Sequence, residues 1–337
     1  MRIAIVNDLP IAVETLKNAV ASVPGYQIAW IAFDGKDAVD KCSKDLPDLI
    51  LMDLIMPVMD GVEATRQIMI SSPCPILIVT ASVRGNSPKV FAAMGFGALD
   101  AVKTPKLGTD KSAEGVRQLL DKISSIEKII SKEKKSYPPI NNIVLHEKPD
   151  SKIKTLIAIG SSTGGPKALA KILSELPADF KFPVVIIQHV DESFAPGLVN
   201  WLGGQTQLNV KIAEAGTSLK PGIVYVAGKN HHLILKPNLT FGYIAEPEDY
   251  PYKPSVDVFF KSAVQNWPGK IIGVLLTGMG RDGAEGLLSI RRANMHTIAQ
   301  DESSSIVYGM PKAAVEISAA VKVLHLDDIA KEILKLA

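Results

Sequence analysis

Short apolar runs alternate with longer amphipathic stretches along most of this chain, and this alternation limits its possible folds more than any other feature. Runs such as Ile3–Val6 and Leu49–Met52 are apolar at every position, which is typical of parallel strands buried on both faces. Between the runs, side chains that can face a core recur at helical spacing, for example at Val62, Thr65 and Met69. The pattern therefore predicts an α/β fold.

The first block of alternation runs from Met1 to about Lys128. Five strand candidates with helices between them predict a doubly wound, five-stranded parallel domain, which we place at residues 1–130. The strand candidates are Ile3–Val6, Gln27–Ile31, Leu49–Met52, Ile76–Val79 and Leu99–Val102.

A polar stretch then interrupts the pattern at residues 131–152. It combines lysine-rich runs with the pair Pro138-Pro139, which predicts a partly extended linker. Acidic residues such as Glu133 and Glu147 interrupt the lysines, and this argues against a polybasic patch for membranes or nucleic acid.

The alternation resumes at Ile153 and predicts a second domain over residues 153–337, a Rossmann-like α/β fold with a mostly parallel sheet. Between Val210 and Ile244 the strand candidates leave little room for helices, which predicts an antiparallel hairpin there. The strand candidates are Thr155–Ile159, Val184–Ile187, Val210–Ala213, Ile223–Ala227, Leu233–Leu235, Ile271–Leu276, Thr297–Ala299 and Val321–Leu324. The helix candidates are Pro166–Glu175, Phe194–Leu202, Val256–Asn266, Ala284–Arg292 and Asp327–Leu336.

Composition excludes several classes of protein. The 337 residues are 47% apolar and carry a net charge of +2, which excludes a disordered chain and gives no electrostatic case for nucleic acid binding. No apolar run approaches the roughly 20 residues of a membrane helix, and Asp8 comes too early for a signal peptide. The two cysteines cannot form a disulfide framework. We therefore expect a cytoplasmic protein without membrane insertion.

Polar side chains follow four strand candidates of the first domain, at the sheet edge where open α/β sheets bind ligands. Carboxylates suit Mg²⁺, and a hydroxyl and an ammonium group can hold phosphoryl oxygens on a carboxylate nucleophile. One aspartate after a strand is more often a helix N-cap, but four such groups at one edge favour a site. These side chains are Asp8, Asp53, Thr80 and Lys103.

Residues 1–128 resemble the receiver domain of two-component response regulators. The resemblance rests on Leu51–Gly61, which reads LMDLIMPVMDG and matches that family's phosphorylation motif. It implies that Asp53 accepts a phosphoryl group from a CheA-type histidine kinase. It also implies that Asp8, Asp53 and the carbonyl of Ile55 hold Mg²⁺.

The same resemblance makes Thr80 the switch hydroxyl and Lys103 the family's lysine. Two positions depart from the family pattern. The usual acidic pair is Asn7-Asp8 here, and the loss of one carboxylate predicts weaker binding of Mg²⁺. Asp100 occupies the place where the family often has an aromatic switch residue, which puts an aromatic switch in doubt.

A glycine-rich turn follows the first strand candidate of the second domain. Residues 160–165 read GSSTGG, which is G-x-S-x-G centred on Ser162, between a strand and a helix as a nucleophile elbow requires. Ser161 fits less well because the glycine frame is then lost. A phosphate-binding turn is the alternative, although the residues match neither the P-loop nor G-x-G-x-x-G.

A histidine and an aspartate follow other strand candidates at the same predicted edge. In this arrangement Ser162 attacks a carbonyl, His189 transfers the proton and Asp282 orients the imidazole. The turn Gly278–Gly283 can offer backbone N–H groups to an oxyanion. Each of these residues can also have a purely structural role, and other residues compete for the roles of base and carboxylate. The rival bases are His231, His232 and His325, and the rival carboxylates are Asp191 and Asp257.

Residues 153–337 resemble the chemotaxis-type protein-glutamate methylesterase domain, commonly called CheB. The resemblance rests on the segments 159–165, 188–189, 254–257 and 276–284. It implies a triad of Ser162, His189 and Asp282, adds the backbone N–H of Met279 as an oxyanion donor, and makes Thr163 and His232 active-site lining.

A receiver joined by a linker to this domain is the architecture of that family. Ser161 stands where the family has alanine. Near His232, Gly228-Lys229-Asn230 replaces the usual proline-glycine turn, as in the Wsp-like branch.

The resemblance implies a phosphorylation-activated serine hydrolase that demethylates glutamate methyl esters on the cytoplasmic helices of chemoreceptors. It implies methanol release, possible deamidation of particular glutamines, Mg²⁺ in the receiver and no cofactor for the esterase. We expect a monomer whose unphosphorylated receiver covers the Ser162 edge. One alternative is an inactive hydrolase-like output domain that acts by protein binding. Another is a DNA-binding output domain, although no basic recognition helix is visible.

Overall fold

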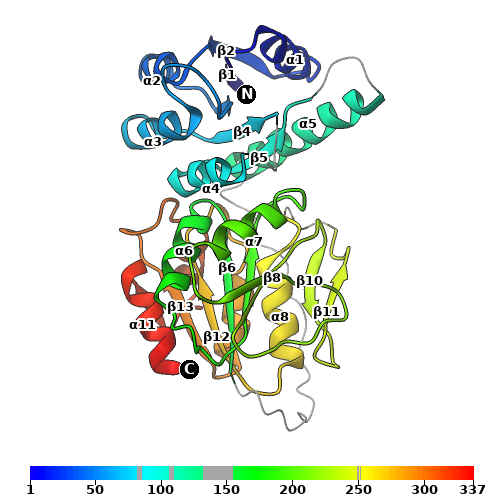
Figure 1. Cartoon of the computed structure of the whole chain (residues 1–337), viewed down its shortest axis with the longest axis vertical. Helices are drawn as coiled ribbons and strands as arrows, with labels where there is room; N and C mark the ends of the chain where they lie inside the picture. Colours follow the sequence, from blue (N-terminus) through cyan, green and yellow to red (C-terminus); the bar gives the residue numbers. More distant parts are fainter. Residues whose placement is uncertain (82–85, 106–109, 132–154, 249, 251) are drawn as a thin grey trace. The chain divides into compact units, whose positions relative to one another are not determined.

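The computed structural model describes residues 1–81, 86–105, 110–131, 155–248, 250 and 252–337. The chain divides into two compact units, residues 1–133 and 134–337, which we describe separately (Figure 1). All but the first residue of the predicted linker, 131–152, lies outside the described residues.

The first unit is a five-stranded parallel sheet in the order β2-β1-β3-β4-β5, which confirms the doubly wound prediction. The order reverses between β1 and β3, so the carboxyl ends of these two strands form the switch point where open sheets bind ligands. The elements are β1 (Arg2–Val6), α1 (Pro10–Ala21), β2 (Gln27–Ala32), α2 (Gly35–Lys44), β3 (Leu49–Met52), α3 (Gly61–Ser71), β4 (Ile76–Thr80), α4 (Ser87–Phe96), β5 (Asp100–Lys103) and α5 (Asp110–Ser131).

The core of the first unit explains why its central strands were recognisable. Every residue of β3 and β4 is buried, since helices cover both faces of the sheet. Cys42 of α2 and Cys74, just before β4, are also buried in this unit as free thiols, with 3.9 Å between their sulfur atoms.

The second unit contains a seven-stranded sheet in the order β14-β13-β12-β6-β7-β9-β8, in which every pairing is parallel. A separate sheet holds β10 and β11, which form the predicted antiparallel hairpin. The strands are β6 (Thr155–Ser161), β7 (Val184–Gln188), β8 (Asn209–Ile212), β9 (Ile223–Val226), β10 (His232–Leu235), β11 (Phe241–Ile244), β12 (Lys270–Leu275), β13 (His296–Gln300) and β14 (Lys322–Leu324). The helices are α6 (Gly165–Glu175), α7 (Ala195–Gly203), α8 (Val256–Asn266), α9 (Ala284–Arg292), α10 (Met310–Glu316) and α11 (Leu326–Leu336).

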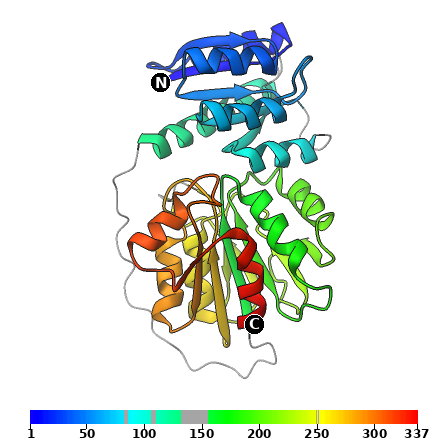
Figure 2. The same cartoon turned by 90° about the vertical axis from the view of Figure 1, so that its left-hand side faces the viewer.

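Helices cover both faces of the seven-stranded sheet. In Figure 2, α11 (red) packs beside α6 (green), while α8 and α9 pack together on the opposite face. The chain winds outward from β6 in one direction and from β12 in the other, so the switch point lies between these two strands. None of the helices in the described part of the chain is long and apolar enough to span a membrane.

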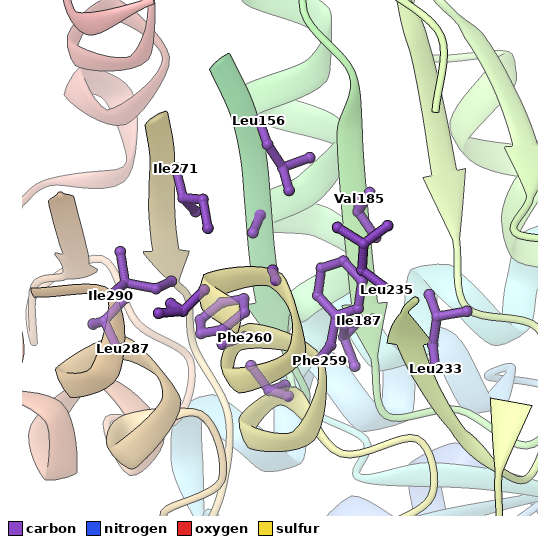
Figure 3. Close-up of a cluster of buried hydrophobic side chains, with 14 of the residues drawn as sticks. Leu156, Val185, Ile187, Leu233, Leu235, Phe259, Phe260, Ile271, Leu287 and Ile290 are labelled. Carbon is purple, nitrogen blue, oxygen red and sulfur yellow. The ribbon is translucent and has the colours of Figure 1, made fainter. Parts of the chain in front are cut away.

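The core between the sheet and α8 fixes the position of that helix. Phe259 and Phe260 of α8 project into a cluster of side chains from β6, β7, β12 and the hairpin (Figure 3). A Cβ atom on Gly160 would overlap the side chain of Val256, so the first turn of α8 lies directly against β6. The N-terminus of α8 is thereby held at the carboxyl edge of the sheet.

Candidate active site

Ser162 lies at the switch point of the seven-stranded sheet. Ser161 ends β6 in register with Gln188 of β7, and the N–H of His189 donates to the carbonyl of Ser161 at 3.1 Å. On the other side, the N–H of Ser162 donates to the carbonyl of Thr277 at 3.1 Å. The serine therefore lies between the segments that follow β7 and β12.

Glycines permit the close approaches around Ser162. Gly164 has φ 78°, in the left-handed region that favours glycine, and it is the N-cap of α6. A Cβ on Gly278 would lie 2.8 Å from the Cβ of Ser162. The turn after β12 can therefore contact the serine only because position 278 has no side chain.

Gln188 joins the strand of the nucleophile to the strand of the base. Its Oε1 accepts a 2.7 Å hydrogen bond from Ser161 Oγ, and its Nε2 donates to the carbonyls of Ser162 at 2.9 Å and His189 at 3.1 Å. Gln188 and Ser161 are both fully buried. The sequence assigned neither a role, and only Gln188's position directly after a strand candidate could have drawn attention to it.

His189 and Asp282 form a buried pair. His189 Nε2 lies 2.8 Å from Asp282 Oδ2, and both side chains are 4% exposed. A carboxylate only accepts hydrogen bonds, so Nε2 carries the proton and Nδ1 has the lone pair. Nδ1 is buried and has no hydrogen-bonding partner among the described residues. It is the nitrogen that can act as a base.

The N-terminus of α8 holds the carboxylate of Asp282. Oδ1 accepts from Ser255 Oγ at 2.7 Å and from the N–H of Asp257 at 3.1 Å, and Oδ2 accepts from the N–H of Val256 at 2.7 Å. Burial alone would raise the pKa of Asp282, but the bonds from His189, Ser255 and Val256 lower it. Asp282 therefore remains a carboxylate beside the imidazole. Ser255 had no predicted role, although a serine before a helix is an N-cap signal.

His232 lies behind Ser255 in the same network. Its Nδ1 accepts from the N–H of Ser255 at 3.1 Å, and its Nε2 donates to the carbonyl of Pro247 at 3.1 Å. Burial lowers the pKa of this fully buried histidine. Both ring nitrogens are therefore engaged, and His232 supports the N-terminus of α8 instead of acting as a rival base.

The other rivals bind elsewhere. His231 and His325 are exposed, and His325 caps α11. Asp191 accepts from Asn230 Nδ2 at 2.8 Å in a loop contact, and Asp257 accepts from the N–H of Gly286 at 2.6 Å. The carboxylate bonded to His189 is that of Asp282.

The peptide between Gly278 and Met279 can serve as an oxyanion donor. The carbonyl of Gly278 accepts from the N–H groups of Gly309 at 3.1 Å and Met310 at 2.8 Å, at the start of α10. In a trans peptide the N–H points opposite to the carbonyl, so the N–H of Met279 points away from α10. Thr163, which is buried beside Ser162, accepts a bond from Thr277 Oγ1 at its carbonyl.

In the first unit, Asp53 follows β3 at the switch point. Its Oδ1 accepts from the N–H of Leu54 at 2.7 Å, and its Oδ2 accepts from Asn7 Nδ2 at 3.0 Å. Burial, together with the nearby charge of Asp8, raises the pKa of Asp53 to about 6.

The oxygens around Asp53 fit a hard cation. Asp8 and Asp53 bring two carboxylates close enough to repel each other, and the carbonyl of Ile55 belongs to the same loop. Asn7 contributes no oxygen, because its Oδ1 accepts from the N–H of Leu9 at 2.9 Å and its amide nitrogen faces Asp53.

Thr80 and Lys103 end the next two strands. Thr80 is fully buried and accepts a 3.1 Å bond from Asn86 Nδ2, while Lys103 is exposed. Asp100, at the place of the aromatic switch residue, pairs with Lys122 of α5 at 2.5 Å. An ion pair between β5 and α5 thus occupies the place of an aromatic ring.

Comparisons with known proteins agree with this architecture. Residues 157–333 match the family model for the CheB methylesterase, and residues 3–107 match the response regulator receiver domain. A protein-glutamate methylesterase/protein-glutamine glutaminase of Mesorhizobium japonicum is 50% identical, over 99% of this chain and 98% of the relative. One from Pseudomonas aeruginosa is 49% identical over 98% of each chain.

Among solved structures, the CheB methylesterase catalytic domain of Thermotoga maritima is 34% identical with a TM-score of 0.53. The match covers 56% of this chain and 100% of that one. The two family matches are consecutive and together span most of the chain, in the same order as the two units of the structure. The chain belongs to the CheB methylesterase family and carries an N-terminal response regulator receiver domain.

Proposed function

We propose that this chain is a serine hydrolase that demethylates glutamate methyl esters on chemoreceptors, with Ser162 as nucleophile, His189 as base and Asp282 as the group that orients the base. The observation that carries the proposal is the buried His189–Asp282 pair at the switch point where Ser162 follows β6. The names of the relatives support the substrate class.

The chemistry follows from the three side chains. Nδ1 of His189 takes the hydroxyl proton as Ser162 Oγ bonds to the ester carbonyl carbon, and the N–H of Met279 donates to the resulting oxyanion. The tetrahedral intermediate collapses when His189 returns the proton to the leaving methoxide, which departs as methanol. Water then repeats the sequence on the acyl-enzyme and releases the glutamate. With a glutamine substrate, ammonia leaves instead of methanol.

In the receiver we propose Asp53 as the phosphoryl acceptor and a CheA-type histidine kinase as the donor. Asp8, Asp53 and the Ile55 carbonyl would hold Mg²⁺, which supplies charge neutralisation for phosphoryl transfer. Thr80 and Lys103 lie at the ends of the neighbouring strands and bind phosphoryl oxygens. The proposed site of action is the cytoplasm, where the helical substrate and the kinase meet a monomeric enzyme.

The test is methanol release from receptor membranes that carry glutamate methyl esters. Wild-type protein should release methanol faster when a phosphodonor is present, and Asp53→Ala should remove that increase. Ser162→Ala should abolish release in both conditions. A folded wild-type protein that releases no methanol in either condition would favour the output domain that acts by binding alone.

A further inference from the structure

The ring of Tyr252 lies flat against the imidazole of His189. The two ring centroids are 4.0 Å apart, and the ring planes differ by 10°. Tyr252 belongs to the connection between β11 and α8, three residues before the N-cap Ser255. Tyr252 therefore belongs to the segment that leads directly into the N-terminus of α8, which holds the carboxylate of Asp282.

The hydrogen bonds of His189 leave its ring incompletely restrained. Nε2 is bonded to Asp282, while Nδ1 has no partner among the described residues. A single bond of this kind allows the imidazole to rotate out of its plane. Asp282 cannot follow such a rotation, because Ser255 and two backbone N–H groups hold its carboxylate.

A ring stacked on the imidazole supplies the missing restraint. Rotation of His189 toward Tyr252 would drive one ring into the other, since parallel rings 4.0 Å apart are already in contact. The stack also helps to keep His189 only 5% exposed. The face of a tyrosine ring is electron-rich and attracts a positive charge placed over it.

We propose that Tyr252 is a positioning residue for the hydrolytic reaction. It holds the imidazole with Nε2 on Asp282, which leaves Nδ1 as the basic nitrogen, and it stabilises the positive charge that the imidazole gains with the Ser162 proton. The inference rests on the proposed function, because it assigns Tyr252 to the same site. It predicts an effect on turnover and not on binding of the receptor.

The test compares three substitutions in the full-length protein. Tyr252→Phe keeps the stacked ring, whereas Tyr252→Leu and Tyr252→Met keep an apolar side chain without a ring. We expect kcat for methanol release to stay within about twofold in the phenylalanine variant. In the leucine and methionine variants kcat should fall about 10- to 100-fold with KM nearly unchanged, because small misplacements of a catalytic group have effects of that size.

A second readout does not depend on the receptor. The rate at which a fluorophosphonate labels Ser162 should fall in the leucine and methionine variants in parallel with kcat, and Tyr252→Phe should restore it. Circular dichroism and urea unfolding identify any variant that does not fold, and the two ringless variants provide independent comparisons.

Wild-type labelling rates in both ringless variants would overturn the proposal, as would a loss confined to KM, which would make Tyr252 a substrate contact. Equal impairment of Tyr252→Phe would overturn it too, because the hydroxyl would then be the important group. A failure of the proposed function would look different, since the wild-type protein itself would release no methanol while the labelling comparison still tested Tyr252.

Discussion

Asn7 donates its amide hydrogen to Asp53, with 3.0 Å between Nδ2 and Oδ2. At the position of Asn7, receiver domains more often have a second carboxylate. The hydrogen bond holds the carboxylate of Asp53 but adds no negative charge to the proposed cation site. At the proposed Mg²⁺ site, Asn7 should therefore give a weaker attraction for the ion than an acidic pair would give.

The first prediction concerns that residue. Asn7→Asp should bind Mg²⁺ about tenfold more tightly, because it adds a carboxylate next to Asp8 and Asp53. Calorimetric titration of the full-length protein with Mg²⁺ measures the change. Asn18→Asp, which adds the same charge on the exposed face of α1, is the matched control. Equal affinities in the two variants would contradict the prediction.

The second prediction concerns the orientation of His189. Asp282→Asn should lower kcat for methanol release by about 10⁴-fold, because an amide that donates toward the imidazole favours the wrong tautomer. Steady-state methanol assays measure the loss, with circular dichroism as the check on folding. Retention of activity within tenfold of the wild type would rule out Asp282 as the orienting group.

The third prediction concerns Ser255, which helps to hold the carboxylate of Asp282. Ser255→Ala removes both the N-cap of α8 and a hydrogen bond to a buried carboxylate, and should lower the free energy of unfolding by about 1 to 3 kcal/mol. It should also lower kcat. Ser289→Ala is the control, since that hydroxyl donates to the carbonyl of Glu285 within α9. In urea unfolding, the loss of unfolding free energy should be clearly larger in Ser255→Ala than in Ser289→Ala.

The fourth prediction concerns pH. Burial and the adjacent charge of Asp282 raise the pKa of Asp257 to about 7, from an unfolded value of about 4. A carboxyl with a raised pKa takes up a proton on folding, so its contribution to stability is complete below pH 4 and is lost as pH rises through 7. Asp257→Asn can still accept from Gly286 and should flatten this decline.

Urea midpoints of the second unit between pH 5 and pH 8 measure the slope. Asp179→Asn, at an exposed position, should keep the wild-type slope. A slope that Asp257→Asn leaves unchanged would show that another group takes up the proton.

Much of the fold could be predicted because its central strands are buried on both faces. Apolar runs such as Leu49–Met52 and Thr155–Ile159 are typical of such strands, and the residues after them lie at the switch points. The short helix α10 has no counterpart among the predicted helices. Its seven residues are too few for a helical period to be distinct.

The supporting residues of the site could not be predicted in the same way. Gln188 and Ser255 act through hydrogen bonds to groups 26 and 27 positions away in the chain. Such pairings depend on how strands and helices pack together, and the hydrophobic periodicity of the sequence gives no information on that packing. His232 illustrates the difference, because the sequence left it only as a rival base, whereas its two hydrogen bonds show a support for α8.

The two buried thiols make this protein convenient to label. Cys42 is 1% and Cys74 5% exposed, so a maleimide dye has no native cysteine at the surface to react with. One new cysteine on each unit could therefore carry a donor and an acceptor fluorophore in an otherwise unaltered chain. Energy transfer between them would report whether the two units change their separation when a phosphodonor is added.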